Sequence, residues 1–433
     1  MKKSDEIIYI EMPEKQLTFS TKNHALDNND NFSPDGKFLC YDTRATVYNE
    51  NLANCKSIEK VEIATGTETV LWEPPNITGE NAAPGVAAAS FHPKENKVIF
   101  IHGPFLDEVE ERGYYDIRNR NGIEIDSEGN GKITKVDLRD VKNASTIHGA
   151  HRGGTHRHEY TRNGNRIGFT YDDFILQNYD RTIGYMEKNR KGPKGHSHFF
   201  SLILKPAEKE KSKPGEIEKA FGDSWIDSYG TMRAFIGKVR SENGIDYKYD
   251  LFVADIPSEV NITTSFSGNQ DEYPTPPKGI NIRRLTYGME VTGIVRGSYN
   301  GEMIAFAAKD ENGINQLFII GAEGPQKEPI KVTNLENDVE YIRWHSSDHW
   351  IIYVSGGNIF ASSINPTIFG KTVQFTNDEK KRTQLVVSQD GNTFAYNIKT
   401  ETRDIETKLV KDAAGNDFMQ IFIMNVDWSK IIL

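Results

Sequence analysis

Short stretches of alternating apolar and polar residues run along the whole chain, separated by turn-forming residues. The clearest unit runs from Asn31 to Tyr41, where a Ser-Pro-Asp-Gly turn leads into Lys-Phe-Leu-Cys-Tyr, which alternates as a strand does. In such a turn proline fixes φ, aspartate bonds the nearby backbone, and Gly36 supplies a positive φ. No long segment shows the 3.6-residue spacing of an amphipathic helix. The pattern predicts an all-β chain.

The same unit recurs, so the chain is built from repeats. Seven copies separated by several tens of residues are typical of the blades of a propeller. We therefore predict an all-β, seven-bladed β-propeller with four-stranded blades, forming a single domain over residues 1–433. The early copies lie further apart than the late ones, which places insertions in blades one to four, notably at 103–145, 173–220 and 256–280. The repeated turns lie at 33–36, 92–93, 161–164, 227–230, 298–301, 345–348 and 388–391.

A second marker is an apolar residue followed by threonine, where an outer strand would pass to the next blade. Because one copy lies near the N-terminus, we expect residues 7–10 and 16–18 to complete a blade with the C-terminal stretch 419–424. Such closure leaves no free sheet edge. The marker occurs as Leu17-Thr18, Leu285-Thr286, Val332-Thr333 and Phe375-Thr376.

Composition narrows the classes of partner. The net charge is -10 and no lysine- or arginine-rich run follows the chain, so nucleic acid is not expected as a partner. No stretch of about 18 apolar residues occurs, so no membrane span is expected. Cys40 and Cys55 do not make a disulfide framework. The N-terminus lacks the apolar core of a signal peptide, which predicts a cytoplasmic protein, or a periplasmic one if a signal peptide has been removed.

The Ser-Pro-Asp-Gly turns and Leu-Thr strand ends resemble the TolB-type (PD40) propeller repeat over nearly the whole chain. The stretch from Arg152 to His158, Arg-Gly-Gly-Thr-His-Arg-His, is followed by an Asn-Gly turn. It is similar to an uncharacterised bacterial propeller family grouped with the oligogalacturonate lyases. The resemblance implies a seven-bladed, cytoplasmic, metal-dependent protein that acts on a uronic-acid-containing oligosaccharide.

Histidines gather in blade three. His156 and His158 are two apart on a predicted strand, so their side chains are expected on the same face, about 7 Å apart. His196 and His198 repeat the spacing where the third strand of that blade is expected to begin. Two such pairs at one face of the channel predict a divalent transition metal, and imidazole suits Mn²⁺, Fe²⁺, Ni²⁺ or Zn²⁺. The alternative is that these are solvated loop histidines.

Arginines and a tyrosine near the same face suit a uronate substrate. Guanidinium binds carboxylate bidentately and lowers the cost of removing the neighbouring proton, which a histidine or tyrosine can accept. Each of these side chains is also explained by blade packing. The predicted catalytic residues are His151, Arg152 and Tyr160, and the predicted substrate-binding residues are Arg157, Arg181, Arg233 and Arg296.

The segment that contains Asp126, Glu128, Asn130 and Asp137 has two interpretations, a calcium-binding loop and a hairpin turn. The residues fit most of the EF-hand pattern, but an EF-hand needs a helix on both sides and none precedes Asp126. Alternating stretches flank the loop instead. The sequence therefore favours a hairpin between the outer strands of blade two.

Two functions of different classes remain open. One is a metal-assisted lyase that cleaves an acidic oligosaccharide by β-elimination. The other is a non-catalytic TolB-like propeller that binds a protein or a glycan. Histidine, arginine and tyrosine converging on one ion at the channel mouth would favour the lyase, whereas an exposed apolar patch would favour docking.

Overall fold

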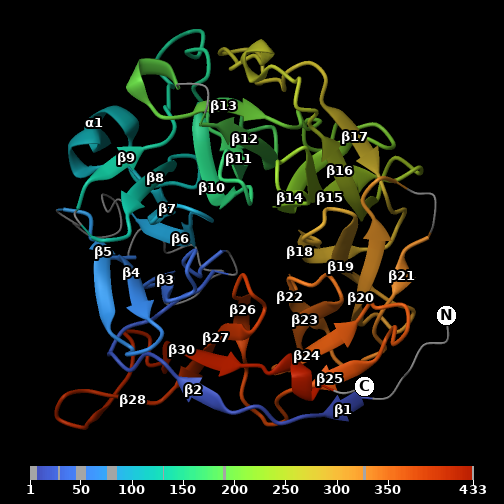
Figure 1. Ribbon diagram of the computed structural model, residues 1–433. Helices are drawn as coiled ribbons and strands as arrows, with labels where there is room; N and C mark the ends of the chain where they lie inside the picture. The colour runs from blue at the N-terminus through green and yellow to red at the C-terminus, as the bar shows by residue number, and fades with distance from the viewer. Residues whose placement is uncertain are drawn as a thin grey trace.

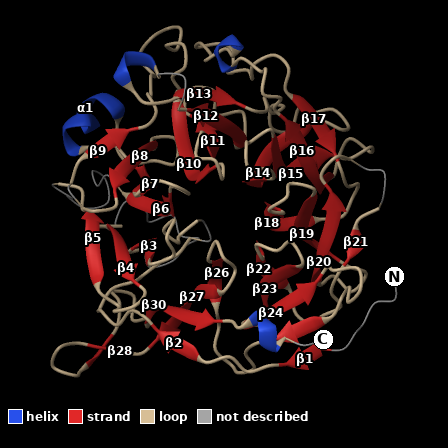
Figure 2. Ribbon diagram, viewed as in Figure 1, coloured by secondary structure: helices blue, strands red, loops and turns tan. Residues whose placement is uncertain are grey.

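The computed structural model is a ring of seven β-sheets around a central axis (Figure 1). It describes residues 7–27, 30–44, 55–75, 85–129, 131–188, 192–324 and 328–431. Strands dominate, and the helices in this part of the chain are single short turns at the rim (Figure 2). The predicted seven-bladed propeller is confirmed.

Each blade is an antiparallel sheet whose strands follow one another from the axis outward. In blade one the innermost strand is irregular and is held to β3 by bridges at Ala25 and Phe32. The first four blades contain β3 (Phe38–Asp42), β4 (Ile58–Glu62) and β5 (Glu68–Trp72); β6 (Val86–Phe91), β7 (Lys97–His102), β8 (Asn121–Asp126) and β9 (Ile133–Lys135); β10 (Gly153–Tyr160), β11 (Arg166–Asp173), β12 (Thr182–Glu187) and β13 (Phe199–Leu202); and β14 (Ile217–Trp225), β15 (Met232–Arg240), β16 (Tyr247–Asp255) and β17 (Asn281–Arg284).

The remaining blades follow the same plan, except that both ends of the chain take part in the last two. The predicted second strands all form within β3, β7, β11, β15, β19, β23 and β27. Blades five to seven contain β18 (Val291–Gly297), β19 (Met303–Lys309), β20 (Asn315–Gly321) and β21 (Ile330–Lys331); β22 (Val339–Trp344), β23 (Trp350–Ser355), β24 (Asn358–Ser363), β25 (Thr372–Gln374) and β1 (Ile7–Tyr9); and β26 (Thr383–Val387), β27 (Thr393–Thr400), β30 (Phe418–Asn425) and β2 (Glu14–Gln16).

The hydrophobic core lies between blades. Seven large clusters of buried apolar side chains each combine residues of two neighbouring blades. One of them joins blade seven to blade one, with Ile421 and Ala395 against Leu39 and Val61. A single blade therefore buries its apolar faces only when it has a neighbour on each side.

The repeated turns are held by one hydroxyl. Ser33 Oγ donates to Asp35 at 2.7 Å and accepts the backbone N–H of Phe38 at 2.9 Å, while Gly36 takes a φ of 69°. This arrangement fixes the start of the second strand without a partner from elsewhere. The same pair of bonds is made by Thr161, Ser298 and Ser388.

The threonine markers are also explained. Thr286 Oγ1 accepts the N–H of Leu251 in the third strand and donates to Asp250. The hydroxyl therefore satisfies a buried N–H where the outer strand leaves the sheet. Thr333, Thr376 and Thr18 make the equivalent pair of bonds in blades five, six and seven.

The N-terminal segment closes the ring by pairing with two blades. Strand β2 pairs antiparallel with β30, as predicted for a closing strand. Residues 7–9 do not join the C-terminal stretch, contrary to the prediction. They form β1, which pairs in parallel with β25 of blade six. Arg382, which is buried, holds both oxygens of Glu14 at 2.7 Å and so attaches this segment to blade seven.

The long connections lie at the rim. The 103–120 connection holds η2 (Leu106–Glu108) and α1 (Val109–Arg112), and 256–280 joins β16 to β17 through η4 (Ile262–Thr264). The 173–220 region contains β12 and β13 in addition to loops. Strands β8 and β9 form the predicted hairpin; Asn130 lies outside the described residues. The other short elements are η3 (Pro193–Gly195), η5 (Trp428–Lys430) and the hairpin of β28 (Thr402–Arg403) and β29 (Leu409–Val410).

None of the helices in the described residues is long and apolar enough to cross a membrane. The expectation of no membrane-spanning helix therefore holds for this part of the chain.

The closure makes a testable prediction. Replacing Thr18 by Val removes the hydroxyl that accepts the N–H of Ile421 and donates to Gln420, and all three residues are buried. Leaving those groups unpaired should lower the free energy of unfolding by about 1–3 kcal/mol. Urea denaturation measures the loss. Thr18→Ser keeps the hydroxyl and should retain most of the stability; equal losses in the two variants would contradict this role.

Candidate functional site

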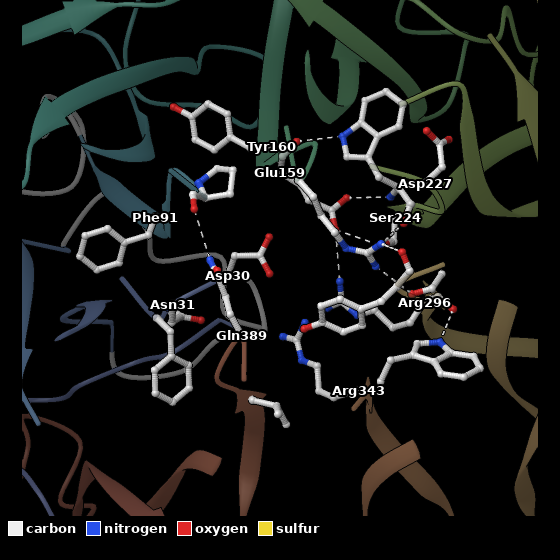
Figure 3. Close-up of a pocket in the computed structure, with 18 of the residues that line it drawn as sticks. Asp30, Asn31, Phe91, Glu159, Tyr160, Ser224, Asp227, Arg296, Arg343 and Gln389 are labelled. Atoms are coloured by element: carbon white, nitrogen blue, oxygen red, sulfur yellow. Dashed lines mark hydrogen bonds and ion pairs between the residues drawn. The ribbon is translucent and has the colours of Figure 1, made fainter. Parts of the chain in front are cut away.

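A cavity of about 350 Å³ opens at one end of the central channel. It is lined by the last residues of the innermost strands and by the turns that follow them (Figure 3). This is the end opposite to the face where the innermost strands begin, which is where the sequence placed the candidate residues. The lining includes Asp30, Asn31, Phe32, Phe91, Glu159, Tyr160, Arg162, Ser224, Trp225, Arg296, Tyr299, Arg343, Trp344 and Gln389.

A bulge in each regular innermost strand determines which side chains reach this cavity. Strands β6, β10, β14, β18, β22 and β26 all shift register just before their last residues. A residue in the left-handed region lies at every shift. A bulge re-aims the side chains that follow it, and here these include Glu159, Arg296 and Arg343. The left-handed residues are Ala88, Arg157, Gly222, Gly293, Tyr341 and Gln384.

Glu159 is the centre of the hydrogen bonds in the cavity wall. Its carboxylate accepts from Ser224 Oγ at 2.9 Å, from Arg233 Nη1 at 3.0 Å and from Arg296 Nη1 at 3.3 Å. Arg233 in turn donates to Asp223 at 2.7 Å. Burial alone would raise the pKa of Glu159, but Arg233, Arg157 and Arg296 hold it below its usual range. Glu159 is therefore a fixed anion that positions arginines of two neighbouring blades, Arg233 of blade four and Arg296 of blade five.

Charged side chains of both signs line the rest of the cavity, with Arg296 and Arg343 as buried cations. Burial lowers the pKa of Arg296 well below its usual range, and the charges of Arg343 and Arg157 lower it further. Burial likewise lowers the pKa of Arg343 to about 10, with Arg157 adding to the shift. Asp30 lies among them with its carboxylate exposed toward the cavity (Figure 3). Burial within the channel and the neighbouring Glu159 raise its pKa.

Aromatic rings form the rest of the wall. Trp225 Nε1 donates to the carbonyl of Glu159 at 3.0 Å, and Trp344 Nε1 donates to that of Arg296 at 2.9 Å. The guanidinium of Arg162 lies 4.4 Å from the centre of the Tyr299 ring. The cavity therefore combines flat apolar surfaces with a few fixed charges, as small-molecule sites do.

The predicted catalytic residues do not come together. His151 and Arg152 precede β10 and Tyr160 ends it, so they span the length of that strand. His151 Nε2 lies 3.3 Å from Asp137, and Arg152 Nε donates to Asp173 at 2.9 Å; both side chains are fully buried. Tyr160 lines the cavity, but its hydroxyl donates to Glu124 at 2.6 Å. Burial and Glu124 raise its pKa well above the usual range.

The histidines predicted to bind a metal are separated by the bulge in β10. Arg157 has a φ of 50°, which breaks the alternation that would place His156 and His158 on one face. His156 Nε2 lies 2.8 Å from Asp172 and its Nδ1 lies 2.9 Å from Arg120. His158 Nε2 instead lies 3.1 Å from Thr155 Oγ1. The two imidazoles thus have separate partners.

The second predicted pair, His196 and His198, does not lie at the start of the third strand, where it was expected. The third strand of blade three is β12, so His196 and His198 precede the fourth strand, β13. His198 is buried, and its Nδ1 lies 2.8 Å from Ser197 Oγ. Among the described residues no three His, Cys, Asp or Glu side chains are placed to hold one metal ion. The metal site stays a prediction. Asp137, a residue of the alternative calcium loop, accepts hydrogen bonds from Asn121 Nδ2 and Thr155 Oγ1.

Of the predicted substrate-binding arginines, Arg296 alone lines the cavity. Arg157 donates to the carbonyl of Asp223, and Arg181 donates to Asp172. Arg233 is buried behind Glu159.

Sequence reasoning missed Asp30, Glu159 and Arg343. The signal was present, since Glu159, Arg296 and Arg343 each lie two residues before the first residue of the repeated turn. Ser224, three residues before its turn, has the same place in the strand register.

Buried histidines of blades two and three give the stability of the fold a pH dependence. Burial lowers the pKa of His156 to about 3 and those of His102, His158 and His198 to about 4. An unfolded histidine has a pKa of about 6.5. Between these values the unfolded chain binds more protons than the folded one, so stability is present above pH 6.5 and is lost as the pH falls.

We therefore expect the free energy of unfolding to decrease steadily from about pH 6.5 to about pH 4.5. Denaturation at a series of pH values measures the slope. His158→Gln removes one of these groups and should reduce proton uptake on unfolding by about one proton. An unchanged slope in that variant would contradict the assignment.

Comparisons with known proteins find similar sequences and structures. A family model described as a protein of unknown function (DUF3748) matches residues 85–192. The chain is 28% identical over 418 residues to the uncharacterized protein YidR of Escherichia coli (strain K12), covering 90% of this chain and 96% of that protein.

Two solved structures are similar. One is described as "putative TolB" from Agrobacterium tumefaciens, with 12% identity, a TM-score of 0.39, and 86% of this chain and 98% of that chain covered. The other is the acylaminoacyl peptidase of Pyrococcus horikoshii, with 10% identity, a TM-score of 0.47, and 91% and 51% covered.

Proposed function

We propose that this propeller is a binding protein whose channel cavity takes a small acidic ligand, such as the terminal uronate of an acidic oligosaccharide. The observation that carries the proposal is that Arg296 and Arg343 both line the cavity. Burial, followed by the charges of Arg343 and Arg157, lowers the pKa of Arg296. A bound carboxylate would offset this repulsion. Charge-assisted bonds between guanidinium and carboxylate are among the stronger hydrogen bonds in proteins.

The size and the walls of the cavity favour a sugar. A volume of about 350 Å³ is near the lower end of small-molecule sites, which suits one sugar unit better than a protein segment. Trp225 and Tyr299 offer flat faces to the C–H groups of such a ring. Asp30 offers an acceptor for its hydroxyl groups.

Binding is favoured over β-elimination at this cavity. The lyase hypothesis drawn from the sequence assigns proton abstraction to a histidine or a tyrosine near the substrate. The described lining includes no histidine, and the Tyr160 hydroxyl is already bonded to Glu124 with a raised pKa. The lyase hypothesis remains a prediction that rests on the family resemblance.

Calorimetry with galacturonate tests the proposal, with galactose as its neutral counterpart. We expect saturable binding of galacturonate and binding of galactose weaker by at least about tenfold, because a charged hydrogen bond contributes about 1.5–3 kcal/mol. Arg343→Gln should weaken galacturonate binding by about 10–100-fold. Arg403→Gln, on the exposed β28–β29 hairpin, is the matched control and should bind normally.

Equal affinity for both sugars, or full affinity in the Arg343→Gln protein, would overturn the proposal. Thermal melting of each variant checks that it is folded. Incubation with oligogalacturonate provides the second arm: growth of the ultraviolet absorbance of an unsaturated product would indicate a lyase in place of a binding protein.

A further inference from the structure

Asp30 differs from the other carboxylates of the channel cavity. Its side chain is exposed to the cavity, and within the described residues its oxygens make no hydrogen bond or ion pair (Figure 3). Glu159, by contrast, accepts from two arginines. Asp227 accepts the N–H of Met232 in its own turn at 2.7 Å. Asp30 is therefore the carboxylate of the described lining that is available to act on a ligand.

The backbone holds Asp30 at this place. Its carbonyl oxygen accepts the N–H of Phe91 at 2.7 Å, which attaches it to the innermost strand of blade two. The next residue, Asn31, is buried and donates through Nδ2 to the carbonyl oxygen of Cys40 at 2.8 Å. These bonds fix the main chain on both sides of the gap between blades one and two, so the carboxylate stays at the cavity.

The charged groups of the described lining leave a small positive excess. Four cations and three carboxylates line the cavity, so its net charge is +1 when every group is ionised. Without the charge of Asp30 the net charge of the same lining would be +2. The cations are Lys94, Arg162, Arg296 and Arg343, and the carboxylates are Asp30, Glu159 and Asp227.

The cavity is small enough for Asp30 to repel a second negative charge on a ligand. Its volume is about 350 Å³, so one sugar ring with its substituents occupies much of it. Two like charges about 5 Å apart, at an effective dielectric constant of about 20, repel strongly enough to weaken binding more than about tenfold. Burial and the charge of Glu159 already raise the pKa of Asp30, so its ionised form tolerates a further negative charge poorly.

We propose that Asp30 determines the charge of the ligand, so that the channel cavity accepts a sugar with one negative charge, a uronate, and rejects a sugar phosphate. This inference rests on the proposed function. A single carboxylate matches the net charge of the described lining, whereas a phosphate dianion exceeds it. Asp30 thus acts by repulsion, which discriminates between ligands as effectively as an added attraction does.

The test compares galacturonate with galactose 6-phosphate, which has the same ring and carries its anionic group on the same carbon. Calorimetry uses the full-length protein at about pH 8, where the phosphate carries about two negative charges. We expect galactose 6-phosphate to bind about tenfold more weakly than galacturonate, or weaker still, because of its repulsion by Asp30.

Two variants should change this difference in affinity in opposite directions. Asp30→Asn removes the repulsion and should narrow the difference about fivefold or more. Lys94→Gln, at an exposed position of the lining, lowers the net charge and should widen it about twofold or more. Asp271→Asn, an exposed residue outside the lining, is the matched control for the loss of one negative charge and should leave the difference unchanged.

The outcomes separate this inference from the proposed function. If galacturonate does not bind, both are overturned. If galacturonate binds but galactose 6-phosphate binds equally well or more tightly, only the role of Asp30 is overturned. The same holds if the difference in affinity is unchanged in the Asp30→Asn protein or, should that variant not fold, in the Lys94→Gln protein.

Discussion

The structure depends on every blade having two neighbours. Its apolar side chains are buried in the gaps between blades, so one missing contact exposes two faces at once. Strand β2 therefore contributes more to the stability of the ring than its length of three residues suggests. By pairing with β30 it completes blade seven, whose inner strands pack against blade one in the cluster that includes Leu39 and Ile421. The remaining features are arranged on that closed ring.

The closed ring also explains why charged groups can be concentrated at the channel. The ends of the innermost strands converge there, and the same repeat position supplies Glu159, Ser224, Arg296 and Arg343 to the cavity wall. Glu159 is stable in this place because arginines from other blades surround it. The closed ring thus brings one repeat position of several blades to the cavity. The residue type at that position differs from blade to blade, and it determines the chemistry of the wall.

Much of the fold could be predicted from the sequence because its signals are local. The Ser33 and Ser298 turns bond within five residues, and the threonine markers bond at a fixed place in each blade. These contacts follow from residue type and spacing alone. The closing role of Leu17-Thr18 could be inferred for the same reason. The partner of residues 7–9 could not be inferred, because their parallel pairing with β25 is not marked by any repeated sequence pattern.

The candidate site was harder to predict because it depends on backbone irregularity. Strict alternation places His156 and His158 together, but the left-handed Arg157 between them turns their side chains to different partners. The same bulge sends Glu159 into the channel wall. A bulge at a non-glycine residue has no clear mark in the sequence. The placement of Arg343 and Asp30 in the cavity wall could not be predicted, because it depends on how blades that are distant in the sequence are arranged in space.

The N-terminal segment has a consequence for biosynthesis. Thr18 and its partner Gln420 are 402 residues apart, so the first strands made must wait for the last. At roughly 5–20 residues per second, that wait is about 20–80 s. During it, β2 presents an unpaired edge, and its sequence is Glu-Lys-Gln, polar residues of the kind that discourage pairing with other chains. The strand that finally closes the ring is thus also suited to remaining unpaired while the ribosome synthesises blade seven.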